Sequence, residues 1–142
     1  MAVVGGAVDK VDKASRSRIM SRIRSKGNVS TERRLRFAMV RAGIRGWLMH
    51  AKSVQGSPDF FFPSKGLAVF VDGCFWHGCL SCYRRPKSRR DYWDKKLLRN
   101  ITRDRRVNET LRSRRISLLR IWEHEVLQDI PVTLQRIESA LK

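Results

Sequence analysis

Two short apolar runs on either side of a turn sequence constrain the fold of this chain more than any other feature. Residues 58–62 read Pro-Asp-Phe-Phe-Phe, and residues 67–72 read Leu-Ala-Val-Phe-Val-Asp. The residues between them, Pro-Ser-Lys-Gly, favour a turn, and two such runs around a turn are typical of a β-hairpin. The pattern predicts two antiparallel strands, with the start of the first strand close to the end of the second.

The rest of the chain carries alternating helix and strand patterns. Before the hairpin they predict a basic helix from Asp12 to about Arg24, a helix capped by Ser30 or Thr31 that stops at Gly43, and a strand around Trp47 to His50. After the hairpin they predict a long helix that begins with a capping box of Ser88 and Asp91. A central strand from Ile116 to Trp122 and a final helix over Ile130 to Leu141 follow. The inward face of the long helix is marked by Trp93, Leu97, Ile101 and Leu111, with Val107 near its edge. This order indicates an α/β fold with a central sheet flanked by helices. We expect residues 1–11 to form a flexible arm and residues 12–142 a single domain.

The charge balance points to a polyanionic partner. The chain has 31 Lys and Arg against 13 Asp and Glu, a formal net charge of +18. Such an excess attracts nucleic acid, although ribosomal proteins and proteins that bind anionic lipid share it. No run approaches the roughly 20 apolar residues of a membrane helix, and the first residues lack the basic segment of a secretory signal. We therefore expect a cytoplasmic, nucleoid-associated protein without membrane contact.

Acidic residues on predicted inward faces suggest a site for a hard cation, which prefers carboxylate and carbonyl oxygens. Asp59 starts the hairpin, whose turn returns the chain so that either the Val71 carbonyl or the Asp72 carboxylate lies beside it. Glu32 and Asp104 fall on the apolar faces of their helices. The alternatives are that Glu32 only complements a helix dipole and that Asp104 pairs with a neighbouring arginine.

The three cysteines are clustered at the spacing Cys74-x4-Cys79-x2-Cys82, which suits a zinc site better than a disulfide framework. Tetrahedral zinc needs a fourth ligand, either His124 or His77. A closed site of this kind is structural, and the alternative is three unpaired buried thiols. If His124 completes the site, His77 is free to act as a general base, since an imidazole titrates near neutral pH.

Three aromatic residues lie among the basic ones. Phe75 and Trp76 share the cysteine-rich loop, and Trp93 opens the long basic helix. Aromatic side chains bordered by arginines can stack on bases or wedge between base pairs. For Trp93, a place in the core is the competing interpretation.

Together these segments resemble the very-short-patch-repair (Vsr) DNA mismatch endonucleases, over nearly the whole chain from about Asp9 to Glu125. The residues that carry the resemblance are Pro58-Asp59-Phe60, Val69 to His77, Asp91-Tyr92-Trp93, Asn100-x3-Asp104-Arg105 and Trp122-Glu123-His124. The resemblance implies a restriction-endonuclease-like fold of the PD-(D/E)xK type and Mg²⁺-dependent nicking of double-stranded DNA. In the family the nick lies 5′ of the thymine in a T:G mismatch left by deamination of 5-methylcytosine.

The resemblance also implies roles for individual residues. Asp59 matches the metal-binding aspartate, Val71 a position whose main-chain carbonyl binds magnesium, and His77 the general base. Glu32 and Asp104 match acids that hold metal-bound water or orient that histidine. The remaining matches are Phe75, Trp76 and Trp93 to the aromatic wedge, Asn100 to a residue lining the DNA site, and Cys74, Cys79, Cys82 and His124 to the zinc ligands.

Two departures from the family accompany these matches. Asp72 stands where some relatives have histidine, which would add a second carboxylate near the metal, and the segment from His77 to Cys82 differs in length and ligand types. Two other functions fit the same residues: a site-specific nickase that ignores mismatches, and a zinc-containing DNA-binding module without catalysis. We expect a monomer that contacts mismatch-repair proteins.

Overall fold

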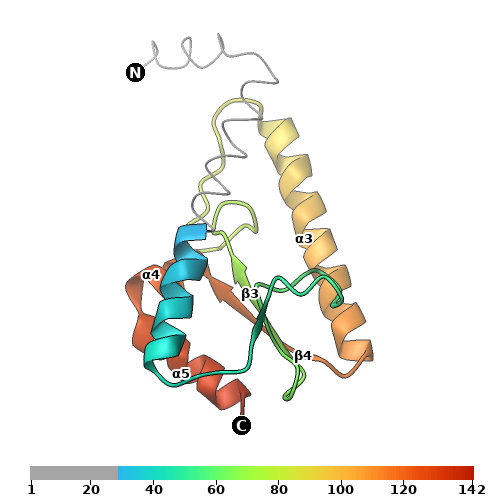
Figure 1. Ribbon diagram of the computed structural model, residues 1–142. Helices are drawn as coiled ribbons and strands as arrows, with labels where there is room; N and C mark the ends of the chain where they lie inside the picture. Colours follow the sequence, from blue (N-terminus) through green and yellow to red (C-terminus); the bar gives the residue numbers. More distant parts are fainter. Residues whose placement is uncertain (1–28) are drawn as a thin grey trace.

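The computed structural model describes residues 29–142. These residues form a mixed sheet covered by helices on both faces (Figure 1), as the sequence predicts. The predicted arm over residues 1–11 and the predicted helix over residues 12–24 lie outside the described residues. Among residues 29–142, none of the helices combines the length and the apolar composition that a membrane span requires.

The sheet has four strands in the order β1-β2-β3-β4. Strand β1 (Leu48–Met49) pairs antiparallel with β2 (Phe60–Phe62), and β2 pairs antiparallel with β3 (Leu67–Asp72), which confirms the predicted hairpin. Strand β4 (Ser117–Trp122) pairs parallel with β3 after the crossover through helix α3 (Arg90–Ser113). The prediction that β4 is a central strand is wrong, because β4 lies at the sheet edge. Helices cover it, and this cover explains its apolar sequence.

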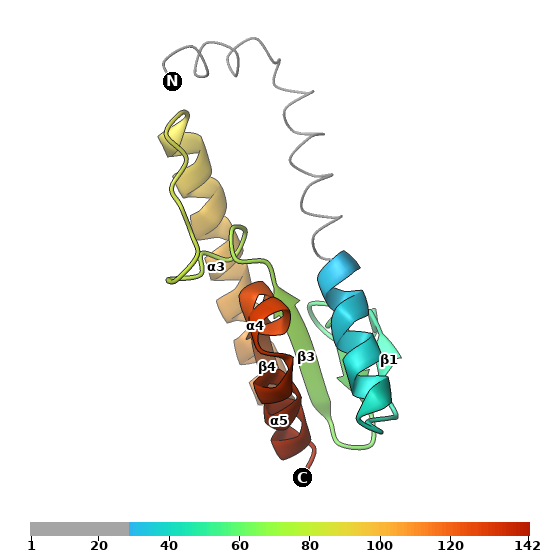
Figure 2. The ribbon, with the colours of Figure 1, turned by 90° about the vertical axis from the view of Figure 1, so that its left-hand side faces the viewer.

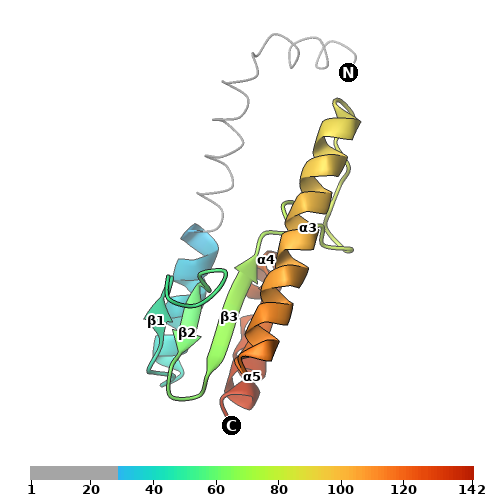
Figure 3. The same ribbon diagram turned by 90° about the vertical axis from the view of Figure 1, so that its right-hand side faces the viewer.

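Strand β3 is buried along its whole length because its alternating side chains serve two cores. Leu67, Val69 and Val71 point to the first core with Leu35 of the helix over residues 29–41 and Ile137 of α5 (Ile130–Ala140). The opposite face, with Ala68 and Phe70, packs against Val107 and Leu111 of α3. Figure 2 shows the helix over residues 29–41 and α5 on one face of the sheet, and Figure 3 shows α3 crossing the other.

Helix boundaries depart from the sequence prediction in three places. Residues 29 and 30 are already helical, so neither Ser30 nor Thr31 is the N-cap. Helix α3 is preceded by Arg89 in the left-handed conformation (φ 54°) without a side-chain cap, so the predicted box of Ser88 and Asp91 is wrong. The short helix α4 (Glu123–Gln128) was missed, since one buried residue, Val126, gives no periodic signal.

The N-terminal half of α3 extends beyond the sheet and lies beside the irregular segment over residues 73–89 (Figures 1 and 2). Trp93, Leu97 and Ile101 are therefore only half-buried, whereas Val107, predicted near the edge of the inward face, is buried. Gly78 allows this close approach: it has φ +68°, and a Cβ there would lie 3.0 Å from Leu97 Cδ1. The loop that leaves β3 is thus held against the basic helix.

Candidate active site and thiol cluster

The predicted acidic site forms where β2 begins and β3 ends. The Val71 backbone N–H donates to Asp59 Oδ2 at 2.6 Å, so the aspartate side chain extends the pairing of β2 with β3 by one step. In a strand the N–H and C=O of one residue point to the same side. The Val71 carbonyl therefore faces the same side as the Asp59 carboxylate, and the role of these two oxygens as metal ligands stays a prediction.

Glu32 reaches this position from the helix over residues 29–41. Burial raises the pKa of Asp59 to about 8, and a hydrogen bond with Glu32 and the negative charges of Glu32 and Asp72 add to the effect, while the Val71 N–H opposes it. A carboxyl group that is this unfavourable as an anion gains strongly from a bound cation. The residues fit a divalent ion in their donor chemistry and in their uncompensated charge.

His77 lies in a second cluster, on the α3 face of the sheet. Its Nδ1 is 2.5 Å from Asp104 Oδ2, and its Nε2 is 3.9 Å from Asp72 Oδ1. Asp104 thus contacts the histidine rather than pairing with Arg103 or Arg105. A carboxylate on Nδ1 fixes the ring orientation and leaves the other nitrogen to accept a proton. Because the Asp72 charge also acts on Asp59, Asp72 links the two clusters.

Asp72 is paired with a residue that the sequence analysis missed. Arg120 on β4 places Nη1 at 3.0 and 3.1 Å from the two Asp72 oxygens, Nε at 2.9 Å from Asn108 Oδ1, and its guanidinium over the Phe70 ring. Burial raises the pKa of Asp72, and the charges of His77 and Arg120 oppose that effect. A lone arginine in an apolar strand was the available signal, since a buried charge needs a partner.

His50 is the second residue that the analysis overlooked. It follows β1, and its Nε2 lies 2.8 Å from Glu32 Oε2 and 3.8 Å from Asp59 Oδ1. The signal was weak: a histidine at the end of the strand predicted to neighbour Asp59. Glu32, His50 and Asp59 together form one of the groups among the described residues that could hold a metal ion.

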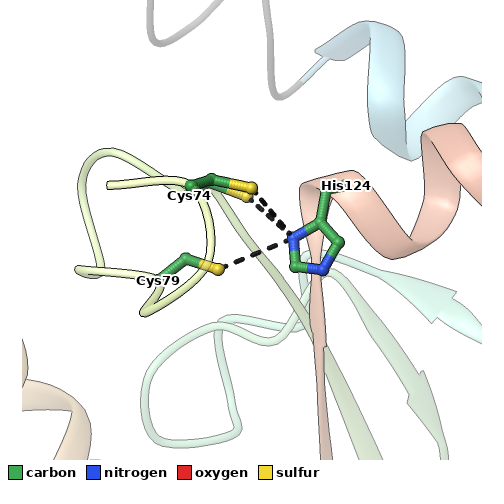
Figure 4. A group of neighbouring side chains, drawn as sticks. Cys74, Cys79 and His124 are labelled. Carbon is green, nitrogen blue, oxygen red and sulfur yellow. Dashed lines mark hydrogen bonds between the residues drawn. The ribbon is translucent and has the colours of Figure 1, made fainter. Parts of the chain in front are cut away.

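The three thiols converge on His124, not on His77. Figure 4 shows the Cys74 and Cys79 sulfurs directed at His124 Nδ1, and the distances from that nitrogen to Cys74, Cys79 and Cys82 Sγ are 3.3, 3.6 and 3.4 Å. Sulfur and nitrogen ligands on one tetrahedral zinc ion are about 3.6 Å apart, given Zn–S near 2.3 Å and Zn–N near 2.0–2.1 Å. The group therefore fits zinc in both donor type and spacing.

The pKa values of two thiols in this cluster shift in opposite directions. Burial raises the pKa of Cys74 to about 12, and the neighbouring thiols add to the shift. Burial also opposes ionisation of Cys79, but hydrogen bonds from the Ser81 and Cys82 backbone outweigh it and lower the pKa of Cys79. Glu123 supports the loop, because its Oε1 lies 3.5 Å from the Cys74 N–H.

The predicted aromatic residues form one cluster between the cysteine-rich loop and α3, in which Trp76 is buried and Phe75 and Trp93 are half-buried. Phe75 lies edge-on to Trp76 and to Trp93, with ring centroids 5.3 and 5.6 Å away, and Trp76 and Trp93 are 6.0 Å apart. Lys96 sits over the Trp76 ring at 5.2 Å. Asn100 is buried and donates from Nδ2 to the Trp76 carbonyl at 2.9 Å, so its amide contacts the protein loop.

Comparison with known proteins decides the family. The family model for the DNA mismatch endonuclease Vsr matches residues 8–84, more than half of the chain. The chain belongs to the Vsr family. It is a DNA endonuclease, and the relatives of this Vsr protein include nicking enzymes.

Three relatives illustrate the range of the family. The type II nicking enzyme V.NaeI of Lentzea aerocolonigenes is 42% identical over 82% of this chain and 72% of its own length. The type II nicking enzyme V.XorIIP of Xanthomonas oryzae pv. oryzae is 36% identical over 94% of this chain and 96% of its own. The DNA mismatch endonuclease Vsr of Escherichia coli is 33% identical over 92% of this chain and 86% of its own.

Proposed function

We propose that this protein is a strand-specific nicking endonuclease of very short patch repair. It cleaves 5′ of the T in T:G mismatches that arise from deamination of 5-methylcytosine, with Mg²⁺ as cofactor and on a restriction-endonuclease-like fold. The observation that carries the proposal is the meeting of the Asp59 cluster and the His77–Asp104 pair at the end of β3, in a chain of the Vsr family.

Asp59 and the Val71 carbonyl are the residues that would hold Mg²⁺, with Glu32 beside them. When bound, the ion polarises the scissile phosphate and stabilises charge on the leaving oxygen. The site supports this assignment because Asp59 is buried with a second carboxylate, Glu32, hydrogen-bonded to it and the Asp72 charge nearby. We assign Asp72 to Arg120, which satisfies both of its oxygens, rather than to the metal.

His77 acts as the general base in this proposal. Asp104 accepts the Nδ1 hydrogen and holds the tautomer in which Nε2 carries the lone pair. Nε2 then takes the proton of the attacking water, and Asp104 stabilises the imidazolium that results. Asp104 is therefore an orienting residue.

In this proposal, selectivity for a mismatch comes from the greater deformability of the DNA at a mispaired base. Phe75, Trp76 and Trp93 would enter the stack where a mispaired base costs least to displace. Asn100 is proposed to position this wedge through the Trp76 carbonyl. The basic residues of α3 would neutralise phosphates, so that affinity falls steeply with salt; they are Arg90, Lys95, Lys96, Arg99, Arg103, Arg105, Arg106 and Arg112.

Cys74, Cys79, Cys82 and His124 would hold a structural zinc ion. A set of four protein ligands leaves no position for substrate, so the zinc contributes folding energy rather than chemistry. Because Cys74 directly precedes Phe75 and Trp76, the ion would also fix the base of the wedge. The chain has one proposed active site, which would cleave one DNA strand, and this is consistent with action as a monomer. Contacts with mismatch-repair proteins remain a prediction.

A nickase that acts without a mismatch is the second candidate, because V.NaeI and V.XorIIP are both named type II nicking enzymes. Duplexes that differ only in one pair, T:G or T:A, and carry a different label on each strand separate the candidates. With Mg²⁺ we expect one cut, 5′ of the mispaired T, and slower cutting of the T:A duplex. Equal rates favour the mismatch-independent nickase, and binding without cutting favours a DNA-binding module.

The wedge is tested on the same two duplexes. Trp76→Ala removes one stacking surface, worth about 1–3 kcal/mol per base, so the ratio of T:G to T:A nicking rates should fall about tenfold. Leu98→Ala is a matched control, because Leu98 is an exposed apolar side chain on α3 outside the cluster. An unchanged ratio in Trp76→Ala refutes the wedge and leaves the nuclease assignment intact.

A further inference from the structure

His50 stands in the acidic cluster without a role in the mechanism above. Its side chain is 54% exposed, yet its Nε2 is directed at Glu32, 2.8 Å away, and lies 3.8 Å from Asp59. These three residues come from separate parts of the chain: the helix over residues 29–41, the end of β1 and the start of β2. The fold thus brings one imidazole nitrogen and two carboxylates to one point.

The backbone at His50 is in an unfavourable conformation. It has φ 48°, the left-handed region, which costs a residue with a Cβ roughly 1–2 kcal/mol. The His50 N–H donates to the Asp59 carbonyl at 3.2 Å, so the turn is tied to the residue that begins the acidic cluster. Strain of this kind persists where the surrounding structure enforces it and gathers at functional sites.

The distances are those of ligands that share one ion. Two donor atoms, each about 2.0–2.2 Å from a metal, are about 3 Å apart when they subtend a right angle and at most about 4.4 Å apart. The separations of His50 Nε2 from Glu32 and from Asp59, 2.8 and 3.8 Å, both fall in this range. The ligand atoms of all three residues lie within 4.8 Å of one another, so one ion placed between them would contact the imidazole and both carboxylates.

We propose that His50 is a nitrogen ligand of the divalent ion held by Glu32 and Asp59, and that it biases this site toward transition-metal ions such as Mn²⁺ over Mg²⁺. Imidazole suits first-row transition ions, whereas Mg²⁺ prefers oxygen. The inference rests on the proposed metal-dependent function, and it extends that function by naming the ligand that sets metal preference.

The test measures metal binding rather than nicking. Mn²⁺ is titrated into the full-length, zinc-loaded protein and followed by electron paramagnetic resonance, Mg²⁺ affinity is measured by competition, and pulsed resonance detects ¹⁴N coupled to the bound Mn²⁺. His50→Asn is the main variant, because asparagine tolerates the left-handed backbone. His77→Gln is the matched control, since His77 is the other histidine of the proposed active site.

We expect a ¹⁴N signal in the wild type that His77→Gln keeps and His50→Asn loses. His50→Asn should raise the Mn²⁺ dissociation constant about tenfold and the Mg²⁺ constant less than twofold. If His50→Asn keeps the nitrogen signal and the Mn²⁺ affinity, the inference is overturned and the proposed Mg²⁺ site stands. If Asp59→Asn binds Mn²⁺ as the wild type does, no ion is held at Asp59 and both proposals fail.

Discussion

Removing the Arg120 guanidinium should destabilise the protein by about 3 kcal/mol, because it leaves Asp72 without its partner. The Asp72 side chain is 7% exposed and Arg120 is 19% exposed, so water replaces little of the lost contact. Breaking a buried ion pair from one side costs about 3–5 kcal/mol, and we take the lower end since His77 also faces Asp72. In a domain of this size that loss lowers Tm by roughly 6–12 °C.

The loss should depend on pH in a direction that the pKa of Asp72 fixes. Burial raises the pKa of Asp72, so the folded protein binds its proton more tightly than the unfolded chain and loses stability as pH rises through the folded-state value. Arg120→Met removes one opposing effect and raises this pKa further. The variant should therefore be closer to the wild type at pH 5 than at pH 8, because a larger share of Asp72 is neutral at the lower pH.

Urea unfolding at pH 5 and pH 8 measures both effects. Arg99→Met is the control, since Arg99 lies exposed on α3, and it should change the free energy of unfolding by less than about 0.5 kcal/mol. The double variant Asp72→Asn/Arg120→Met should recover most of the loss, because it buries a neutral amide in place of a charge. A loss below about 1 kcal/mol in Arg120→Met at pH 8, or a double variant as unstable as the single one, refutes the pairing argument.

Three further results are expected. Because the pKa of Asp59 is raised to about 8, a proton must leave before Mg²⁺ binds. The half-saturating Mg²⁺ concentration for nicking should therefore fall about tenfold per pH unit up to pH 8. A half-saturating concentration that does not change with pH contradicts this prediction. Asp104→Asn should slow single-turnover nicking by about 10²–10⁴ with duplex binding intact, and a rate within threefold of the wild type excludes the orienting role. Cys79→Ser should reduce bound zinc, measured by elemental analysis, from one equivalent per chain to less than half and lower Tm by more than about 10 °C; full zinc content in this variant removes Cys79 from the ligands.

The hairpin and the convergence of Asp59 on Val71 could be predicted because the signal is local. Two apolar runs and a four-residue turn determine which strand ends meet, and the antiparallel register follows from the turn. The grouping of the three cysteines is equally local. Their partner required tertiary information, since His124 is separated from Cys74 by the whole of α3 and β4.

Arg120 and His50 could not be assigned from sequence because their partners lie on other elements. Arg120 meets Asp72 only through the parallel pairing of β4 with β3, which also places β4 at the sheet edge. His50 reaches Glu32 because its backbone is left-handed (φ 48°), and the sequence around it contains no feature that predicts this conformation. The helix α4 was missed for a different reason: it is short and buries one residue, Val126, so it has no apolar periodicity, although Glu125 accepts locally from the Trp122 N–H at 3.1 Å.

The role of His77 is tested most directly by His77→Ala on a labelled T:G duplex, with binding measured in Ca²⁺ and single-turnover nicking in Mg²⁺. We predict binding within about twofold of the wild type and nicking slower by at least about 10²-fold, since a general base contributes about 10²–10⁴ in rate. Nicking at the wild-type rate would contradict the assignment of His77 as the base that takes the proton of the attacking water.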